Sequence, residues 1–487
     1  MNLNIIDHSF HYEMEKLSRI FFPDDVTVFH EKNENGNYVT TERIKTENGD
    51  IIYVKAVFSS EVREKKCLVE PCDRFDNACE KKMAQLLFEV LSELTGYTPP
   101  WGILTGVRPA KLMSKHISQN GEKKALEYFK NELFVSDEKS KLALTVAKNE
   151  APIINKSRDN SFSLYISIPF CPTRCSYCSF VSHSNEQAKK LIPEYVEKLC
   201  QEIEYTGKAV KNLGLRLESV YYGGGTPTTL SAEQYKRISE TIAENFDLST
   251  VEEYTVEAGR PDTVTDEKLK AIKNSGCTRI SINPQTFNDS VLEEIGRKHT
   301  TAQTLEAMKK ARANGFDNIN TDLIAGLPTD TFESFCHTLD TALSLSPESI
   351  TVHTLSKKRS STIATDHLET NDAELCGKML SAASEKLIAN GYEPYYMYRQ
   401  SKCLGNFENV GWAKKGFECL YNVYMMEECH TVIALGAGAV SKLKNPYGDE
   451  IERVYNFKYP YEYINKFQEI IKRKEQITEF CSEIFKR

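Results

Sequence analysis

The sequence of 487 residues is long enough for two or three domains, and its hydrophobic content of 40% supports packed cores. A mean hydropathy of -0.45 and the lack of any apolar run near ~18 residues argue against a membrane-spanning protein, while the net charge of -8 argues against nucleic acid as main partner. The first residues lack the basic and apolar regions of an export signal, so we expect a cytoplasmic protein whose 14 cysteines are reduced.

Residues 1–155 are predicted to form a separate α+β domain, to which the sequence assigns no role. Strand-like runs at 38–45 and 51–58 flank a turn-forming segment, which predicts a β-hairpin, and residues 81–94 have helical periodicity. The Gly- and Pro-containing segment 100–112 carries two cations and Trp101. It either contacts an anionic ligand or packs Trp101 as a structural linker.

Residues 156–375 alternate regularly between strand and helix patterns. Strand-like runs begin at residues 164, 219, 253, 279, 318 and 349, and helix-like segments cover 193–211, 232–245, 265–275, 289–295, 301–314 and 331–345. Six β–α units predict a parallel sheet with helices outside, and right-handed crossovers curl such units into a partial (β/α)6 TIM-like barrel. In barrels of this kind the chemistry takes place at the C-terminal ends of the strands.

Three cysteines, Cys171, Cys175 and Cys178, follow the first of these strands in a CxxxCxxC pattern. Such gaps let one loop place its sulfurs around a single small object, and thiolates select iron–sulfur clusters, zinc or copper(I). No fourth cysteine stands nearby, which favours a cluster with one open iron over a structural zinc site. The alternative is three cysteines that merely pack in a core, and three thiols within eight residues disfavour it.

Polar residues and glycines follow the next strands. Three consecutive glycines, Gly223, Gly224 and Gly225, allow backbone groups to approach a ligand closely, although a plain tight turn has the same composition. Glu257 and Asp322 lie at or within later strands, and each alone is equally well a satisfied core group. Because successive strand ends meet in a barrel, we expect these groups to converge on one cavity.

These motifs resemble the radical S-adenosylmethionine (SAM) superfamily, in which three cysteines hold a 4Fe-4S cluster and SAM chelates the fourth iron. Residues 160–440 are similar to the branch that contains the oxygen-independent coproporphyrinogen III oxidase/dehydrogenase and its heme-chaperone relatives. The resemblance rests on YxxIPFC at 165–171, GGGTP at 223–227 and DLIxGLP at 322–328. The segment 102–109 and the late Leu-Tyr-Asn at 420–422 point to the HemZ-type subgroup.

The resemblance implies a fold, cofactors and binding residues. The fold is a radical SAM barrel with an α+β N-terminal domain and a helix-rich, substrate-covering C-terminal portion, residues 376–487. The cysteines bind a 4Fe-4S cluster, and the SAM contacts are Tyr165, Phe180, Gly223, Gly224, Gly225, Thr226, Glu257, Gln285, Arg297 and Asp322. Cations that contact substrate propionates would be Lys357, Lys358, Arg359, Arg399 and Lys402, with a solvated basic turn and an aromatic core as the alternatives.

Four segments depart from the branch pattern, and one of them is Ser167, where histidine is common in the branch. The oxidase has a fourth cysteine where this chain has Phe180, and its Asn-Pro after Glu257 reads Gly-Arg-Pro at 259–261, one residue longer. The chaperone's His-Asn followed by Tyr-Trp is replaced by Tyr-Asn-Val-Tyr-Met at 421–425. These differences set the chain apart from both sister groups.

The resemblance also implies a reaction. Coproporphyrinogen III propionates would be decarboxylated oxidatively to vinyl groups, giving protoporphyrinogen IX for heme biosynthesis, by a 5′-deoxyadenosyl radical from SAM. The partners would be a tetrapyrrole and a low-potential electron donor such as flavodoxin or ferredoxin, with the protein a monomer that binds no nucleic acid. The alternatives are a heme-binding chaperone or another radical SAM reaction on a tetrapyrrole.

Overall fold

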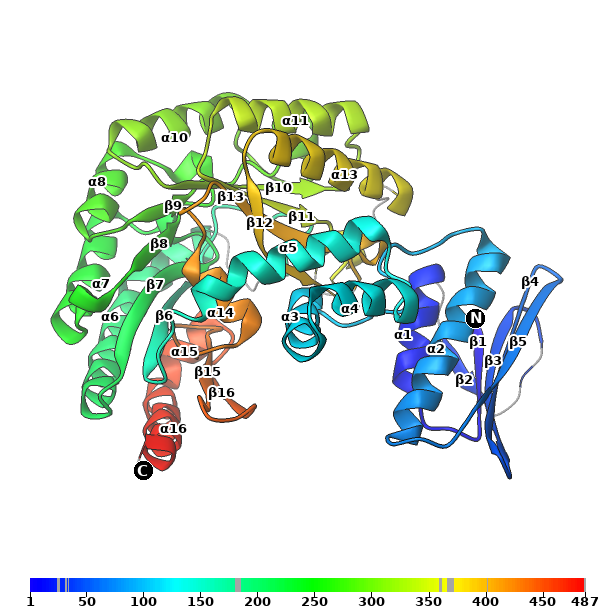
Figure 1. The fold of residues 1–487 in the computed structure, drawn as a ribbon. Helices are drawn as coiled ribbons and strands as arrows, with labels where there is room; N and C mark the ends of the chain where they lie inside the picture. The colour runs from blue at the N-terminus through cyan, green and yellow to red at the C-terminus, as the bar shows by residue number, and fades with distance from the viewer. Residues whose placement is uncertain are drawn as a thin grey trace. The chain divides into compact units, whose positions relative to one another are not determined.

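The computed structural model describes residues 1–23, 27–30, 33, 35–179, 185–358, 361–365, 372–400 and 402–485. The chain divides into two compact units, each described here by itself (Figure 1). The first unit contains Met1–Ala147 and Tyr398–Phe407, and the second contains Lys148–Met397 and Glu408–Arg487. The first boundary lies close to the expected one. Most of the predicted C-terminal portion, however, belongs to the same unit as the barrel.

The first unit contains a five-stranded sheet in the order β2-β1-β3-β4-β5. The predicted hairpin is confirmed, because β3 and β4 pair antiparallel with Thr46 opposite Gly49. Apolar side chains of α1, α2 and the sheet form one core, which includes Met14, Val54 and Leu87. The elements are β1 (Asn2–Ile6), α1 (His11–Phe21), β2 (Val28–His30), β3 (Tyr38–Thr46), β4 (Gly49–Phe58), β5 (Glu61–Val69), α2 (Phe75–Thr95), α3 (Pro109–Asn120), α4 (Glu122–Glu127), η1 (Tyr128–Glu132) and α5 (Asp137–Ile154), which runs into the second unit.

The second unit is built on an eleven-stranded sheet in the order β12-β13-β11-β10-β9-β8-β7-β6-β14-β15-β16. The six predicted strands are its parallel centre: β6 (Ser161–Ile168), β7 (Arg216–Gly224), β8 (Glu253–Glu257), β9 (Arg279–Ser281), β10 (Ile319–Ala325) and β11 (Ser349–Thr354). The partial barrel is therefore confirmed.

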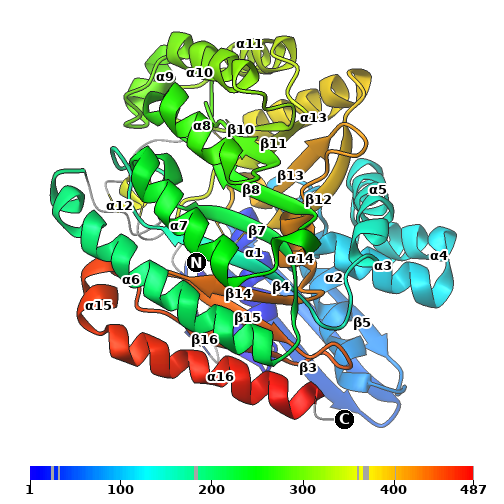
Figure 2. The ribbon, with the colours of Figure 1, turned by 90° about the vertical axis from the view of Figure 1, so that its left-hand side faces the viewer.

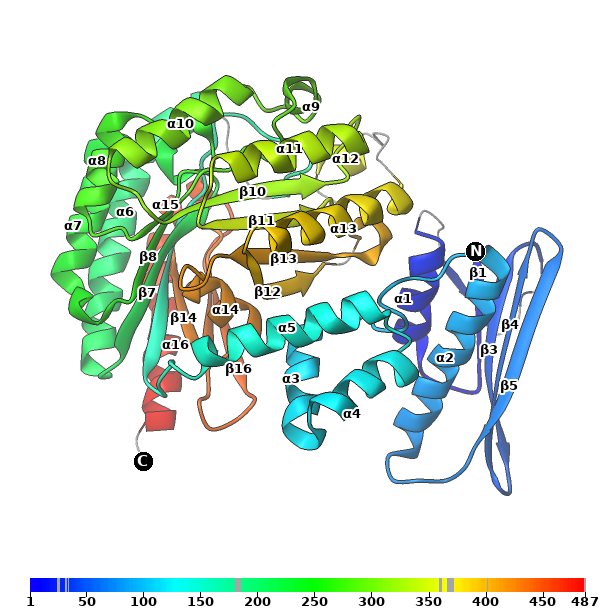
Figure 3. The ribbon, with the colours of Figure 1, turned by 45° about the horizontal axis from the view of Figure 1, so that its top comes forward.

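The predicted helices lie between these strands. They are α6 (Asn185–Asn212), α7 (Ala232–Asn245), α8 (Asp266–Asn274), α9 (Asp289–Glu294), α10 (Thr301–Ala313) and α11 (Phe332–Ser344). In Figures 2 and 3, α6, α7, α8, α10 and α11 follow one another along the outside of the strands. Among the described residues, none of the helices has the length and apolarity needed to cross a bilayer.

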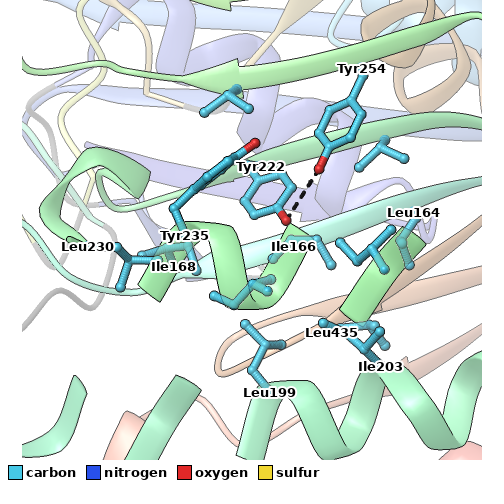
Figure 4. Packing of buried hydrophobic residues seen from close by; sticks show 14 of the residues in the cluster. Leu164, Ile166, Ile168, Leu199, Ile203, Tyr222, Leu230, Tyr235, Tyr254 and Leu435 are labelled. Carbon is cyan, nitrogen blue, oxygen red and sulfur yellow. Dashed lines mark hydrogen bonds between the residues drawn. The ribbon is translucent and has the colours of Figure 1, made fainter. Parts of the chain in front are cut away.

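The core between sheet and helices follows from the alternation of side chains along each strand. Leu164, Ile166 and Ile168 of β6 pack with Leu199 and Ile203 of α6 (Figure 4). The side chains between them, beginning with that of Tyr165, face the barrel interior. Burying a continuous apolar strip of this kind is the main favourable contribution to folding.

The C-terminal portion contributes strands as well as helices, whereas the sequence predicted a helix-rich portion. β14 adds to the barrel sheet parallel to β6, and β13 pairs antiparallel with β11. The helix α16 contacts α6 and lies along it in Figure 2. The elements after the barrel are α12 (Thr362–Thr365), α13 (Ala373–Ala389), β12 (Glu393–Arg399), β13 (Glu408–Ala413), α14 (Leu420–Glu427), β14 (Thr431–Leu435), β15 (Val440–Lys444), β16 (Ile451–Tyr455), α15 (Pro460–Asn465) and α16 (Phe467–Phe485).

Candidate functional site

The three cysteines lie in the loop that follows β6, at the C-terminal end of that strand. The Ser176 amide donates to Ile295 O at 3.0 Å, and the Thr173 hydroxyl donates to Gly296 O at 3.1 Å. The loop is thereby fixed to the segment after α9. Cys175 is buried, whereas Cys171 and Cys178 are partly exposed.

No three His, Cys, Asp or Glu side chains in the described part of the chain converge closely enough to hold a single metal ion. A four-iron cluster binds each thiolate at a different iron, so its ligands need not meet at one point. The donor set of three thiolates on one loop fits such a cluster. Cluster ligation by Cys171, Cys175 and Cys178 stays a prediction.

The glycine segment at the end of β7 packs directly on this loop. The amides of Gly225 and Thr226 donate to Ile168 O and Phe170 O, both at 2.8 Å. A Cβ atom on Gly225 would lie 2.5 Å from Phe170 O, so only glycine permits this approach. The Thr226 hydroxyl also donates to Cys171 Sγ at 3.6 Å. The glycines therefore bring the β7 backbone and one hydroxyl against the cysteine loop.

Carboxyl groups from β8 and β10 lie at the same end of the barrel. The Tyr221 hydroxyl donates to Glu257 Oε1 at 2.5 Å. Asp322 accepts from Asn320 Nδ2 at 2.7 Å and has His353 Nε2 at 3.7 Å. In the sheet, Glu257 lies opposite Ser281 of β9, and Ser281 lies opposite Asn320 of β10, two residues before Asp322. The register therefore brings both carboxylate-bearing strands to neighbouring positions, and their convergence on one ligand cavity stays a prediction.

The two carboxyl groups have pKa values moved in opposite directions. Burial raises the pKa of Glu257 to about 7; the charge of Asp322 adds to the rise, and the Tyr221 hydrogen bond opposes it. For Asp322, burial opposes ionisation, but His353 and Asn320 outweigh it and lower the pKa. Near neutral pH, Asp322 is therefore ionised while Glu257 is partly protonated.

We predict that Glu257 makes folding stability depend on pH. Because its pKa is raised to about 7 from an ordinary 4.5, Glu257 stabilises the folded protein at low pH, and this contribution is lost as pH rises through 7. Urea unfolding between about pH 5 and about pH 8 should show wild type losing stability relative to Glu257→Gln. Glu244→Gln, an exposed glutamate on α7, is the matched control and should follow wild type. Parallel pH curves for wild type and Glu257→Gln would contradict the assignment.

Gln285 has the features of a ligand-binding residue. Its backbone has φ 71°, a region that non-glycine residues rarely adopt, and it bridges to Leu323 of β10. Its side-chain oxygen Oε1 is buried and has no hydrogen-bond partner among the described residues. An unmatched buried acceptor is costly unless a ligand donates to it, and the amine and hydroxyl groups of SAM are such donors. The residues present therefore fit SAM.

Arg297 reaches the cysteine loop from the segment after α9. It is buried, and its guanidinium donates to the Tyr177 hydroxyl at 3.2 Å and to Asn283 O. Burial opposes its charge, but Tyr177 and Cys175 outweigh burial and raise the pKa of Arg297. Arg297 thus places a permanent positive charge beside the loop.

The predicted substrate cations are separated by the fold. Lys357 and Lys358 follow β11 and are partly exposed, while Arg359 and the predicted SAM contact Phe180 lie outside the described residues. Arg399 and Lys402 belong to the first unit. Arg399 is buried 5.4 Å from the ring centre of Trp101 and donates to Leu104 O, so segment 100–112 packs as a linker around this arginine.

Sequence reasoning missed Tyr221, His353 and Arg260 as site residues. Tyr221 lies opposite Tyr165 in the β6–β7 register, so the alternation that points Tyr165 inward also points Tyr221 inward. The same alternation on β11 identifies His353. No comparable signal marks Arg260, which lies in a loop.

The departure at 421–425 lies at the other end of the barrel. Glu253, the first residue of β8, accepts from the backbone amides of Leu420 and Tyr421 at 2.9 and 3.2 Å. The Tyr424 hydroxyl donates to the buried Glu218 near the start of β7. The ring of Tyr421 stacks on Tyr221 at 4.3 Å. α14 therefore closes the N-terminal end of the strands.

Comparison with known proteins agrees with this fold. Residues 165–342 match the sequence model of the Radical SAM superfamily. The solved structure of coproporphyrinogen III oxidase (HemN) from Escherichia coli, a radical SAM enzyme, matches with a TM-score of 0.53 and 23% identity over 65% of this chain and 71% of that one, which supports the fold alone. Fold and sequence thus define a radical SAM protein, and the cofactors are a 4Fe-4S cluster and SAM.

Two sequence relatives refine this class. The oxygen-independent coproporphyrinogen-III oxidase-like protein HemZ of Bacillus subtilis (strain 168) is 34% identical over 98% of this chain and 97% of that protein. The heme chaperone HemW of Haemophilus influenzae is 33% identical over 62% of this chain and 75% of that protein. The chain belongs to the family of oxygen-independent coproporphyrinogen-III oxidase-like radical SAM proteins.

Proposed function

We propose that this protein catalyses the oxygen-independent oxidative decarboxylation of coproporphyrinogen III. The carrying observation is the placement of Glu257, Gln285 and Asp322 at the strand ends that also bear the cysteine loop. Support comes from the relative that aligns over 98% of the chain and is named coproporphyrinogen-III oxidase-like.

In this proposal, Cys171, Cys175 and Cys178 hold the cluster. The SAM contacts are Tyr165, Phe180, Gly223, Gly224, Gly225, Thr226, Glu257, Gln285, Arg297 and Asp322. When bound, the cluster and SAM supply the one-electron chemistry that amino-acid side chains lack. Gln285 Oε1 would accept a hydrogen bond from SAM, and Arg297 would place its positive charge beside the cluster.

The proposed reaction converts two propionate side chains of the substrate. Each propionate loses a hydrogen atom from its β-carbon, then loses CO2 and passes one further electron to an external one-electron acceptor, which leaves a vinyl group. Two such conversions give protoporphyrinogen IX. Lys357 and Lys358 follow β11 at the catalytic end of the barrel, where their charges would bind propionates. Arg359 and Lys402 are proposed as further cations from the sequence alone, whereas Arg399 is buried against Trp101. An external low-potential protein such as flavodoxin or ferredoxin supplies the electrons.

A heme-binding chaperone is the second candidate. The HemW relative, named a heme chaperone, supports it with 33% identity over 62% of this chain. The two functions differ in whether SAM is consumed and whether the porphyrin changes. Purified chaperone would retain heme without converting a tetrapyrrole.

The test is an anaerobic reaction of reconstituted protein with SAM, a reductant and coproporphyrinogen III, analysed by mass spectrometry. We expect a product that has lost one CO2 and two hydrogens per converted propionate, with 5′-deoxyadenosine formed in step. Lys357→Ala and Lys358→Ala should raise KM, whereas Lys472→Ala, an exposed residue of α16, should leave it unchanged. SAM cleavage with an unchanged porphyrin would discard this substrate, and heme retention without SAM cleavage would favour the chaperone.

A further inference from the structure

Arg260 is a buried arginine in the loop where this chain departs from the branch pattern. It follows β8 in the sequence Gly-Arg-Pro and is 3% exposed. Its Nε and one terminal nitrogen contact the two carboxylate oxygens of Asp262 at 3.0 and 3.1 Å. This two-point contact fixes the plane and direction of the guanidinium.

The remaining terminal nitrogen of Arg260 is directed at the cysteine loop. It donates to Thr173 Oγ1 at 2.9 Å and lies 4.0 Å from Cys175 Sγ. Thr173 in turn donates to Gly296 O, next to Arg297. One guanidinium group, that of Arg260, therefore lies close to the Cys175 sulfur, and a second, that of Arg297, contacts Tyr177 on the same loop.

The charges around Cys175 do not cancel. The Asp262 side chain is 20% exposed and directs its oxygens at Arg260, whereas the Arg260 side chain is 3% exposed and contacts the loop. His299 is also close, but burial and then the charges of Arg297 and Arg260 lower its pKa to about 3, so it stays neutral. The local field at Cys175 is therefore positive, and burial leaves it poorly screened.

We infer that Arg260 is a positioning and electrostatic residue of the cluster, which holds the cysteine loop and makes the cluster easier to reduce. The inference rests on the proposed function, because it takes Cys175 as a cluster ligand. Net charge and hydrogen bonds to the sulfurs set the reduction potential of a cluster. A fixed positive charge beside one sulfur stabilises the reduced form, which carries one more electron.

The test is a redox titration of the reconstituted protein followed by EPR, together with iron and sulfide analysis. Arg260→Gln should retain the cluster, but at a fixed potential its ratio of reduced to oxidised cluster should fall about tenfold, or about 59 mV for one electron. Arg260→Lys should restore part of the difference. Arg237→Gln, which removes an equal charge from an exposed ion pair with Glu197 on the outer helices, should match wild type.

Asp262→Asn is expected to change the electrostatic field at Cys175 in the opposite direction. Removing the negative partner leaves the charge of Arg260 in place and should move the midpoint to higher potential. A full cluster with an unchanged midpoint in Arg260→Gln overturns the inference, and so does cluster loss in Arg260→Gln with an unchanged midpoint in Asp262→Asn. Failure of the underlying ligation is distinct, because Cys175→Ser would then retain the wild-type EPR signal.

Discussion

Replacing Cys175 by serine abolishes cluster binding in the proposed site, and we expect the iron content to fall from about four atoms per chain to background. Serine keeps the size of the side chain but removes the soft thiolate that iron requires. The loop itself should survive, because the Ser176 and Thr173 hydrogen bonds do not use the sulfur. Iron analysis and EPR of anaerobically reconstituted protein give the measurement.

The matched control is Cys336→Ser on α11, a partly exposed cysteine of the same unit. It should bind iron as wild type does and cleave SAM at the wild-type rate. Cys171→Ser and Cys178→Ser should behave like Cys175→Ser, since each sulfur would hold a separate iron. A Cys175→Ser protein with full iron content and an unchanged signal would refute the ligand assignment.

Replacing Lys474 by methionine should destabilise the second unit by about 3–5 kcal/mol, because it leaves a buried carboxylate without its charge partner. Lys474 Nζ lies 3.1 Å from Glu202 Oε1 and donates to Ala434 O at 2.7 Å, and both side chains are almost fully buried. Glu202 also accepts from the Gly436 amide at 2.8 Å. The pair therefore holds the turn between β14 and β15.

Urea unfolding followed by circular dichroism measures this effect. Lys472→Met is the matched control, because Lys472 is exposed on the same helix, and its effect should stay within about 0.5 kcal/mol. Equal effects of the two replacements would contradict the assignment. Glu202→Gln should also destabilise the unit, because it leaves the buried ammonium of Lys474 without its charge partner, although the amide oxygen still accepts from Gly436.

The Lys474–Glu202 pair is connected to the cysteine loop through backbone contacts of the turn between β14 and β15. A Cβ atom on Gly436 would lie 2.4 Å from the Tyr195 hydroxyl and 2.7 Å from Ser167 O. The Ser167 hydroxyl donates to Ala437 O at 2.8 Å. The glycine turn therefore packs on the last residues of β6, directly before the cysteines.

The barrel was predictable because its signals are local. α7 has the predicted bounds 232–245, and Ser231 and Gln234 form a reciprocal capping box at its start. The added strands were not predictable in the same way. β14 is short, and its partner β6 is far away in the sequence, so tertiary packing rather than a local sequence pattern selects the pairing.

The residues of the candidate site also fall into a group that local sequence patterns predict and a group that only the fold brings together. The cysteine motif is one contiguous segment and the glycine run is another. The sequence alone therefore identifies each of them. Tyr221 and Arg260 reach the site only through the β6–β7 register and the path of the loop after β8. Arg399 shows the limit most clearly. Its aromatic, cationic neighbours in the sequence suggest a substrate rim, whereas in the structure Arg399 belongs to the first unit and packs against Trp101.

The first unit takes residues from two distant parts of the chain, Met1–Ala147 and Tyr398–Phe407. During synthesis the sheet and helices of this unit emerge first. Trp101 and the Leu104 carbonyl can contact Arg399 only after nearly the whole barrel has been synthesised. A gene fragment that ends at Ala147 therefore encodes an incomplete unit. The first unit is therefore not a simple leading module, because its last segment is encoded after all six barrel strands, between Met397 and Glu408 of the second unit.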